Sequence, residues 1–246
     1  MAEALRTRGL TKRYGGKTAL EGLDLSLESG HIYGLLGPEG AGKTTLLRLL
    51  AGLSFPTSGS FSLFGETSPS RLAKARKRVG FLIGEPIAAE QFSLRKNLEL
   101  QAPLTGRRDE ARLKELRRSL GLTERGVGHR RWRDCAAWER RRYGLAAALL
   151  GQPELLALDE PMNGLDPEGV RMARELLGEL NRDRGVTMLI TGVWPEELRG
   201  LATDYLFLDE GRLLRSMTAQ ALEALDPDRL ASELLRLREE GKGGCE

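Results

Sequence analysis

The chain has 246 residues, of which 40% are hydrophobic and 30% are charged, and its formal net charge is +3. This length suits one large domain or two small ones, and the balance of side chains excludes a disordered chain and a protein with many membrane spans. The longest apolar stretch, over residues 145–150, falls short of the roughly 20 residues that cross a bilayer. The start of the chain has no apolar core of a signal peptide, and Cys135 and Cys245 are too few for a disulfide scaffold. We therefore expect a cytoplasmic protein.

Basic residues cluster twice, over residues 71–78 and 130–142. Such runs can hold nucleic acid or an anionic membrane surface. No ladder of aromatic residues accompanies them, so they lack the platforms on which bases stack. We interpret both clusters as solvated helix faces and expect no nucleic-acid partner.

Alternating or apolar runs predict the strands of the fold. Residues 3–8 and 18–27 alternate apolar and polar side chains, as half-buried antiparallel strands do. Shorter apolar runs predict further strands at residues 31–36, 59–65, 79–83, 155–158, 186–190 and 205–208. The last three of these runs are separated by helical patterns, which predicts a parallel sheet and an α/β fold class.

Two stretches have helical periodicity. Leucines recur at helical spacing over residues 44–53. From residue 93 to about residue 150, Leu, Arg, Lys and Glu dominate, the period is near 3.6 and β-branched residues are scarce, so we expect an inserted α-helical segment. Residues 241–246 are predicted to form a frayed tail.

The strongest chemical signal is GPEGAGKTT at residues 37–45, which fits G-x-x-x-x-G-K-[ST] between a predicted strand and a predicted helix. Glycines let backbone N–H groups turn inward around a phosphate, and the helix N-terminus adds its dipole. Lys43 would reach the β- and γ-phosphates, and the Thr44 hydroxyl would coordinate Mg²⁺. A glycine-rich turn that binds nothing is disfavoured because strand, motif and helix occur together. The residues predicted to bind the nucleotide here are Gly37, Pro38, Glu39, Gly40, Ala41, Gly42, Lys43, Thr44 and Thr45.

A second signal is LLALDEP at residues 155–161. The apolar run predicts a buried strand that presents two carboxylates at the carboxyl edge of the sheet, where open α/β folds bind ligands. Asp159 can hold Mg²⁺ through its water shell, and Glu160 can polarise the water that attacks the γ-phosphate. Alone this pattern is weak, but its position after the phosphate loop and the helical insert makes it specific. We therefore predict ATP and Mg²⁺ as cofactors and Glu160 as the catalytic residue.

With these motifs and the stretch DEPMNGLDP at residues 159–167, residues 3 to about 217 resemble the ATP-binding cassette (ABC) family, the nucleotide-binding subunits of ABC transporters. They are similar in particular to the subunits of bacterial drug-efflux and bacteriocin-immunity exporters. The resemblance implies a RecA-like P-loop NTPase core, a small antiparallel subdomain and an inserted helical subdomain. It places the ATP-binding domain at residues 1–217, with the insert at about 93–150, and leaves a C-terminal helical tail at 218–246.

The resemblance also implies partners. Tyr14 falls where the family stacks an aromatic ring on adenine, and Asp166 matches the loop that touches the opposite subunit. Two cassettes would dimerise head to tail, on the inner face of the cell membrane, and the groove beside residues 84–91 would receive a separately encoded permease. The alternative is a non-transport ABC ATPase that acts on ribosomes or nucleic acid. That class usually carries paired cassettes or long coiled-coil inserts, which this chain lacks.

The chain departs from the family at its signature motif, usually LSGGQ, which aligns with CAAWE at residues 135–139. Ala136 replaces the serine that would bind the γ-phosphate. Trp138 replaces the second glycine, which a close backbone approach requires. Glu139 replaces the last residue, and we expect it to add a negative charge near a phosphate site.

Two further positions are altered. The family's glutamine aligns with Gly84, with Glu85 beside it, and its histidine aligns with Val193. The histidines of the chain, His31 and His129, fall elsewhere and are expected at the surface. The chain should therefore bind ATP but hydrolyse it slowly when alone. A homodimer would combine these defects in both of its sites, so we expect a heterodimer with a partner cassette whose signature is intact.

Overall fold

The computed structural model describes residues 2–105 and 109–226; residues 1, 106–108 and 227–246 lie outside this description. The chain divides into two units, one formed by Met1–Thr67 with Thr191–Glu246 and the other by Ser68–Ile190. Of the predicted helical tail, only the first part is described, and it contains the short helix α7 (Ala219–Glu223). The predicted frayed tail at 241–246 lies wholly outside the described residues.

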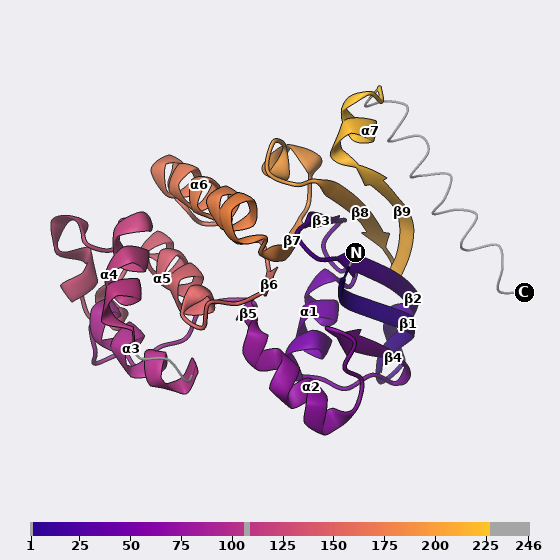
Figure 1. Ribbon diagram of the computed structural model, residues 1–246, viewed down its shortest axis with the longest axis horizontal. Helices are drawn as coiled ribbons and strands as arrows, with labels where there is room; N and C mark the ends of the chain where they lie inside the picture. Colours follow the sequence, from indigo (N-terminus) through magenta and orange to yellow (C-terminus); the bar gives the residue numbers. More distant parts are fainter. Residues whose placement is uncertain (1, 106–108, 227–246) are drawn as a thin grey trace, which may run out of the picture. The chain divides into compact units, whose positions relative to one another are not determined.

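The first unit contains a three-stranded antiparallel sheet (Figure 1). Its strands, in the order β2-β1-β4, are β2 (Lys17–Glu28), β1 (Glu3–Tyr14) and β4 (Ser58–Leu63). Leu5 pairs with both Leu27 and Leu63, and all three side chains are buried. The predicted antiparallel strands are confirmed. β1 extends beyond its predicted end because bulges shift its register and let it continue past the alternating stretch.

A second set of strands in this unit carries the helix that follows the phosphate loop. The buried strand β3 (Ile32–Leu36) pairs in parallel with β8 (Asp204–Asp209), and α1 (Lys43–Ala51) follows β3 and ends at the left-handed Gly52. β9 (Arg212–Thr218), antiparallel to β8, was not predicted. Its side chains are mostly half-buried, so apolar and polar residues hardly alternate along the strand. The signal that could have found it is the tight turn of Glu210 and Gly211, both at positive φ.

The second unit is built on three parallel strands whose residues are almost all buried. They are β5 (Val79–Leu82), β6 (Leu155–Leu158) and β7 (Thr187–Gly192), and the last two residues of β7 belong to the first unit. The predicted parallel strands are confirmed. The helices of this unit are α2 (Pro69–Ala75), α3 (Leu94–Gln101), α4 (Glu110–Ser119), α5 (Ala137–Leu149) and α6 (Pro167–Arg184).

The predicted helical insert at about 93–150 corresponds to α3, α4 and α5, which lie together in Figure 1 and are joined by short 3₁₀ turns. These turns are Ala102–Thr105, Glu124–His129 and Trp132–Asp134. α2, which carries part of the first basic cluster, was not predicted as an element. Across the described residues, no helix is both long enough and apolar enough to cross a membrane.

Gly80 in β5 allows α5 to approach the sheet. A Cβ atom there would lie 2.1 Å from the Ala148 carbonyl oxygen and 2.7 Å from Leu156 Cδ2. Gly80→Ala should therefore lower the free energy of unfolding by about 1–3 kcal/mol, as measured by urea titration. At Gly151 the nearest atom to an added Cβ is 3.6 Å away, so Gly151→Ala should change the free energy of unfolding by less than about 0.5 kcal/mol. Equal effects of the two substitutions would contradict this account.

Candidate functional site

The loop between β3 and α1 requires two of its glycines. A Cβ atom at Gly37 would lie 2.0 Å from the Leu208 carbonyl oxygen, and one at Gly42 would lie 2.4 Å from the Ala19 carbonyl oxygen. Gly42 also has a φ of 107°, which L side chains rarely adopt. Packing against the neighbouring backbone therefore fixes the shape of this loop and explains the glycines of the motif.

The loop presents positive charge to an anionic ligand. Gly42 is the N-cap of α1, and within this described segment no side chain caps the helix and no acidic residue lies in its first turn. The buried Lys43 curls back into the loop, where its Nζ donates hydrogen bonds to the carbonyls of Gly37 and of Pro38, the latter at 2.9 Å. Thr44 lies in the same turn, half-buried. A helix N-terminus beside an ammonium group fits a chain of phosphates.

Tyr14, at the end of β1, is placed for stacking. Its side chain is 45% exposed, and its hydroxyl donates to Ser54 Oγ at 3.3 Å. Lys12 Nζ lies 4.7 Å from the centre of the ring and donates to the Phe55 carbonyl at 2.8 Å. The ring is therefore held in place while much of it stays accessible, which fits a platform for a base.

The two carboxylates follow β6 directly. Asp159 is buried, and its N–H donates to the Leu82 carbonyl at 2.7 Å. Glu160 has a left-handed backbone with a φ of 45°, a conformation that costs a non-glycine residue roughly 1–3 kcal/mol and is concentrated at functional sites. Asn163 donates from its side-chain amide to Glu160 Oε2 at 3.3 Å. The phosphate loop lies in the first unit and these carboxylates in the second.

Arg141 of α5 is a component that the sequence analysis missed. Its guanidinium donates to the carbonyls of Gly84 at 2.8 Å and Asp159 at 2.7 Å, and also to that of Glu160. Burial lowers the pKa of Arg141, and the neighbouring acidic groups Asp159, Glu85 and Glu160 act in the opposite direction. The side chain belongs to the basic cluster that we expected to be a solvated helix face. For this residue the expectation is wrong, because the guanidinium replaces solvent as the partner of three carbonyls.

The signature position forms the start of α5. Ala136 is the N-cap and has no side-chain oxygen to offer the helix. Glu139, fully buried, accepts the Ala136 N–H at 2.7 Å and pairs with Arg130 Nη1 at 2.7 Å. The carboxylate therefore closes the first helical turn internally, and the expectation that it adds a charge near a phosphate site stays a prediction. Cys135 precedes the helix, and burial raises the pKa of its thiol to about 11.

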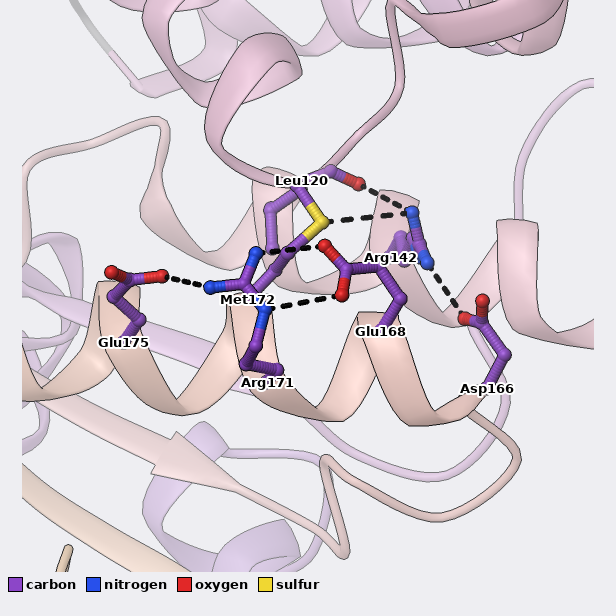
Figure 2. A network of polar contacts seen from close by, with 7 residues as sticks. All are labelled: Leu120, Arg142, Asp166, Glu168, Arg171, Met172 and Glu175. Carbon is purple, nitrogen blue, oxygen red and sulfur yellow. Dashed lines mark hydrogen bonds and ion pairs between the residues drawn. The ribbon is translucent and has the colours of Figure 1, made fainter.

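Arg142 ties α5 to the segment that follows the carboxylates (Figure 2). It is 4% exposed and donates to Asp166 Oδ1 at 2.6 Å and to the Leu120 carbonyl at 3.3 Å. Burial raises the pKa of Asp166, but the hydrogen bond and charge of Arg142 outweigh burial and leave this pKa below its usual value. The Trp138 ring lies over the Arg142 guanidinium, 4.7 Å from Cζ to the ring centre. Arg142 is thus a second member of the basic cluster that has partners within the chain, and it is buried.

The remaining altered positions have distinct surroundings. Gly84 is exposed and left-handed, with a φ of 64°, and the adjacent Glu85 is exposed. Val193 is half-buried, and its N–H donates to Glu197 Oε2 at 3.4 Å. Of the histidines, His129 is exposed as expected. His31 is half-buried instead, because its Nδ1 lies 2.8 Å from Asp204 Oδ2.

No cluster of three or more His, Cys, Asp or Glu side chains suited to a metal ion occurs in the described part of the chain. The predicted Mg²⁺ ligands are Thr44 and Asp159, a hydroxyl and a carboxylate. Such a sparse oxygen set fits Mg²⁺, which keeps several waters and takes further oxygens from substrate phosphates. It does not fit a metal held by protein groups alone.

Comparison with known proteins decides the family. A model of the ABC transporter family matches residues 20–163, more than half of the chain. The chain belongs to the ABC transporter family. The bacitracin transport ATP-binding protein BcrA of Bacillus licheniformis is 35% identical over 220 residues, 88% of this chain and 70% of the relative. The daunorubicin resistance ATP-binding protein DrrA3 of Streptomyces coeruleorubidus is 39% identical over 228 residues, 90% of this chain and 70% of the relative.

Solved structures agree on the fold. An ATP-binding subunit of an ABC transporter has a TM-score of 0.83 and 24% identity, covering 94% of this chain and 99% of the other. The ATP-binding cassette MJ0796, in a dimeric post-hydrolysis state bound to ADP and Pi, has a TM-score of 0.79 and 22% identity. The match covers 87% of this chain and 98% of the other. The predicted α/β P-loop NTPase fold is confirmed. The chain is an ABC-type ATP-binding subunit, and its membership of this ATPase family indicates an ATP-hydrolysing activity.

In this ABC subunit, the internal role of Glu139 can be tested by substitution. Glu139→Ala removes the acceptor of a buried N–H and the partner of Arg130, so it should lower the free energy of unfolding by about 1–3 kcal/mol in urea titrations. Glu99→Ala is the control, because the Arg95–Glu99 pair is exposed and should contribute less than about 0.5 kcal/mol. Unchanged stability together with tighter ATP binding would show instead that Glu139 faces a phosphate.

Proposed function

We propose that this chain binds Mg-ATP and powers an exporter through a separate permease in the cell membrane. The observation that carries this proposal is the phosphate loop, in which packing imposes the glycines and Lys43 curls back toward the loop carbonyls. Export is supported by relatives that are named for bacitracin transport, daunorubicin resistance and, in Burkholderia orbicola, Nod factor export. The last is 38% identical over 224 residues.

Each predicted residue has a role in this proposal. Tyr14 stacks on adenine, and residues 37–45 bind the phosphates, with Lys43 on the β- and γ-phosphates. Thr44 and Asp159 hold Mg²⁺, which when bound neutralises charge that develops on the phosphates. Glu160 orients and polarises the attacking water. Its left-handed backbone and its hydrogen bond from Asn163 support this role because they fix the carboxylate in place.

We further propose that hydrolysis is slow without a partner. Ala136 has no hydroxyl for a γ-phosphate across a dimer interface, and Trp138 carries a large ring where the family has glycine. That ring is engaged with Arg142, so it cannot move without breaking the contact. Val193 is aliphatic where the family has histidine. Losing one positioned group costs about 10²-fold or more in rate, so a heterodimer with an intact cassette is favoured over a homodimer.

The chain would lie on the inner face of the membrane, and the permease would dock beside its residues 84–91. Ile87 is 86% exposed in this segment, and Phe92 at its end is also exposed. Exposed apolar side chains of this kind fit a protein partner. The reported relatives are transport, resistance and export subunits, and none of the observations favours the alternative of a ribosome- or nucleic-acid-directed ATPase.

Nucleotide binding is tested by removing the ammonium group of the loop. Lys43→Ala should abolish Mg-ATP binding in calorimetry, because it removes the cation placed on the phosphates while the glycine-imposed backbone stays intact. Tyr14→Ala should weaken binding by only about 1–3 kcal/mol, the usual contribution of stacking. Lys74→Ala, at an exposed lysine of α2, is the control and should leave affinity unchanged. Parent-like affinity of Lys43→Ala would refute the assignment of the loop.

Partner dependence is tested by restoring the altered groups. The purified chain should bind Mg-ATP and turn it over slowly, and Val193→His alone should not rescue turnover. Ala136→Ser and Trp138→Gly added to Val193→His should raise turnover by more than the separate changes combined, because these groups act as one unit. Brisk ATPase activity of the unmodified chain, abolished by Glu160→Gln, would overturn this part of the proposal.

A further inference from the structure

The second unit contains a cation that joins two loops at the carboxyl ends of adjacent strands. Arg141 extends from α5 and donates to Gly84 O, which follows β5, and to the carbonyls of Asp159 and Glu160, which follow β6. The strands β5 and β6 are parallel neighbours, so both loops leave the same edge. The guanidinium is a planar fork and can bridge acceptors on separate segments, whereas an ammonium group is a point charge.

The carbonyls that Arg141 binds belong to an unusual backbone. Glu160 has a φ of 45° and Gly84 a φ of 64°. Glycine adopts such a conformation freely, but glutamate persists there only where its surroundings hold it. Hydrogen bonds to the carbonyls on either side of the Glu160 Cα supply that hold, since they fix both peptide groups that define its conformation.

We propose that Arg141 is a positioning residue for ATP hydrolysis, which holds the main chain of Glu160 so that its carboxylate meets the attacking water. This inference rests on the proposed hydrolytic role of Glu160. Asn163 fixes the carboxylate from the side chain, and Arg141 fixes the backbone from which that side chain extends. Arg141 also binds the turn at Gly84, where the family's glutamine is absent. Its acceptor there is the backbone carbonyl, so the contact needs no side chain at residue 84.

The test separates positioning from binding. Arg141→Lys keeps the charge but cannot bridge three carbonyls, so it should lower the single-turnover rate of ATP hydrolysis about 10- to 100-fold. Mg-ATP affinity in calorimetry should stay close to that of the parent. Hydrogen exchange of the backbone amides of residues 159, 160, 162 and 163 should become faster. Arg117→Lys is the matched control, since Arg117 is a half-buried arginine that donates to the Leu113 carbonyl at 3.2 Å. This substitution should leave the single-turnover rate, the Mg-ATP affinity and the amide exchange unchanged.

Arg141→Ala adds a second variant, whose rate should fall at least as far as that of Arg141→Lys. A parent-like rate in Arg141→Lys would overturn the proposal, as would a parallel loss of rate, ATP affinity and melting temperature, which indicates a merely structural role. If the parent hydrolyses no more ATP than Glu160→Gln, the proposed hydrolysis fails. In that case amide exchange still decides: unchanged exchange at residues 159, 160, 162 and 163 in Arg141→Lys refutes the hold on Glu160.

Discussion

The N-cap of helix α5 is Ala136, which has no side-chain oxygen, and the start of the helix is stabilised by a buried carboxylate that binds the backbone N–H of this residue. The orphan N–H groups of a first turn need acceptors, and a serine at the N-cap would supply one. Glu139 does not replace that oxygen: it turns back to the N–H of Ala136 itself, and this buried carboxylate in turn requires Arg130. The start of the helix is therefore stabilised from within the chain.

One altered signature residue, Trp138, is physically linked to residues outside the signature. Trp138 adds a ring where the family has glycine, and that ring covers Arg142, which holds Asp166. A buried arginine that loses its covering ring is left with fewer favourable contacts, so glycine at residue 138 exposes the same cation that fixes Asp166. The phosphate loop shows the opposite behaviour. There each required glycine meets neighbouring backbone, and the family pattern is retained without compensation.

The sequence predicted those parts of the fold and site that depend on local pattern. The run at 155–158 became β6 at the predicted bounds because a fully buried strand shows as a continuous apolar run. The phosphate loop was predicted because its motif encodes a backbone shape. β9 was missed because an edge strand buries little, and α2 because it is short and buries only Leu72 and Ala75. The role of Arg141 was missed because its acceptor Gly84 lies 57 residues away in sequence, and a carbonyl carries no side-chain signal.

The misreading of the second basic cluster has a general geometric cause. Consecutive helical residues project about 100° apart, so the four charges of residues 139–142 cannot share one solvated face. In α5 they separate: Glu139 turns to the N-cap, Arg141 to the carbonyls after β5 and β6, and Arg142 to Asp166. Arg140, the fourth, lies against the Trp132 ring. A helix that packs on several neighbours must bury some members of any charge run this long, and each buried member needs a partner. A dense run of charges on such a helix therefore indicates internal polar contacts, and here one of them, that of Arg141, reaches the backbone of Glu160 itself.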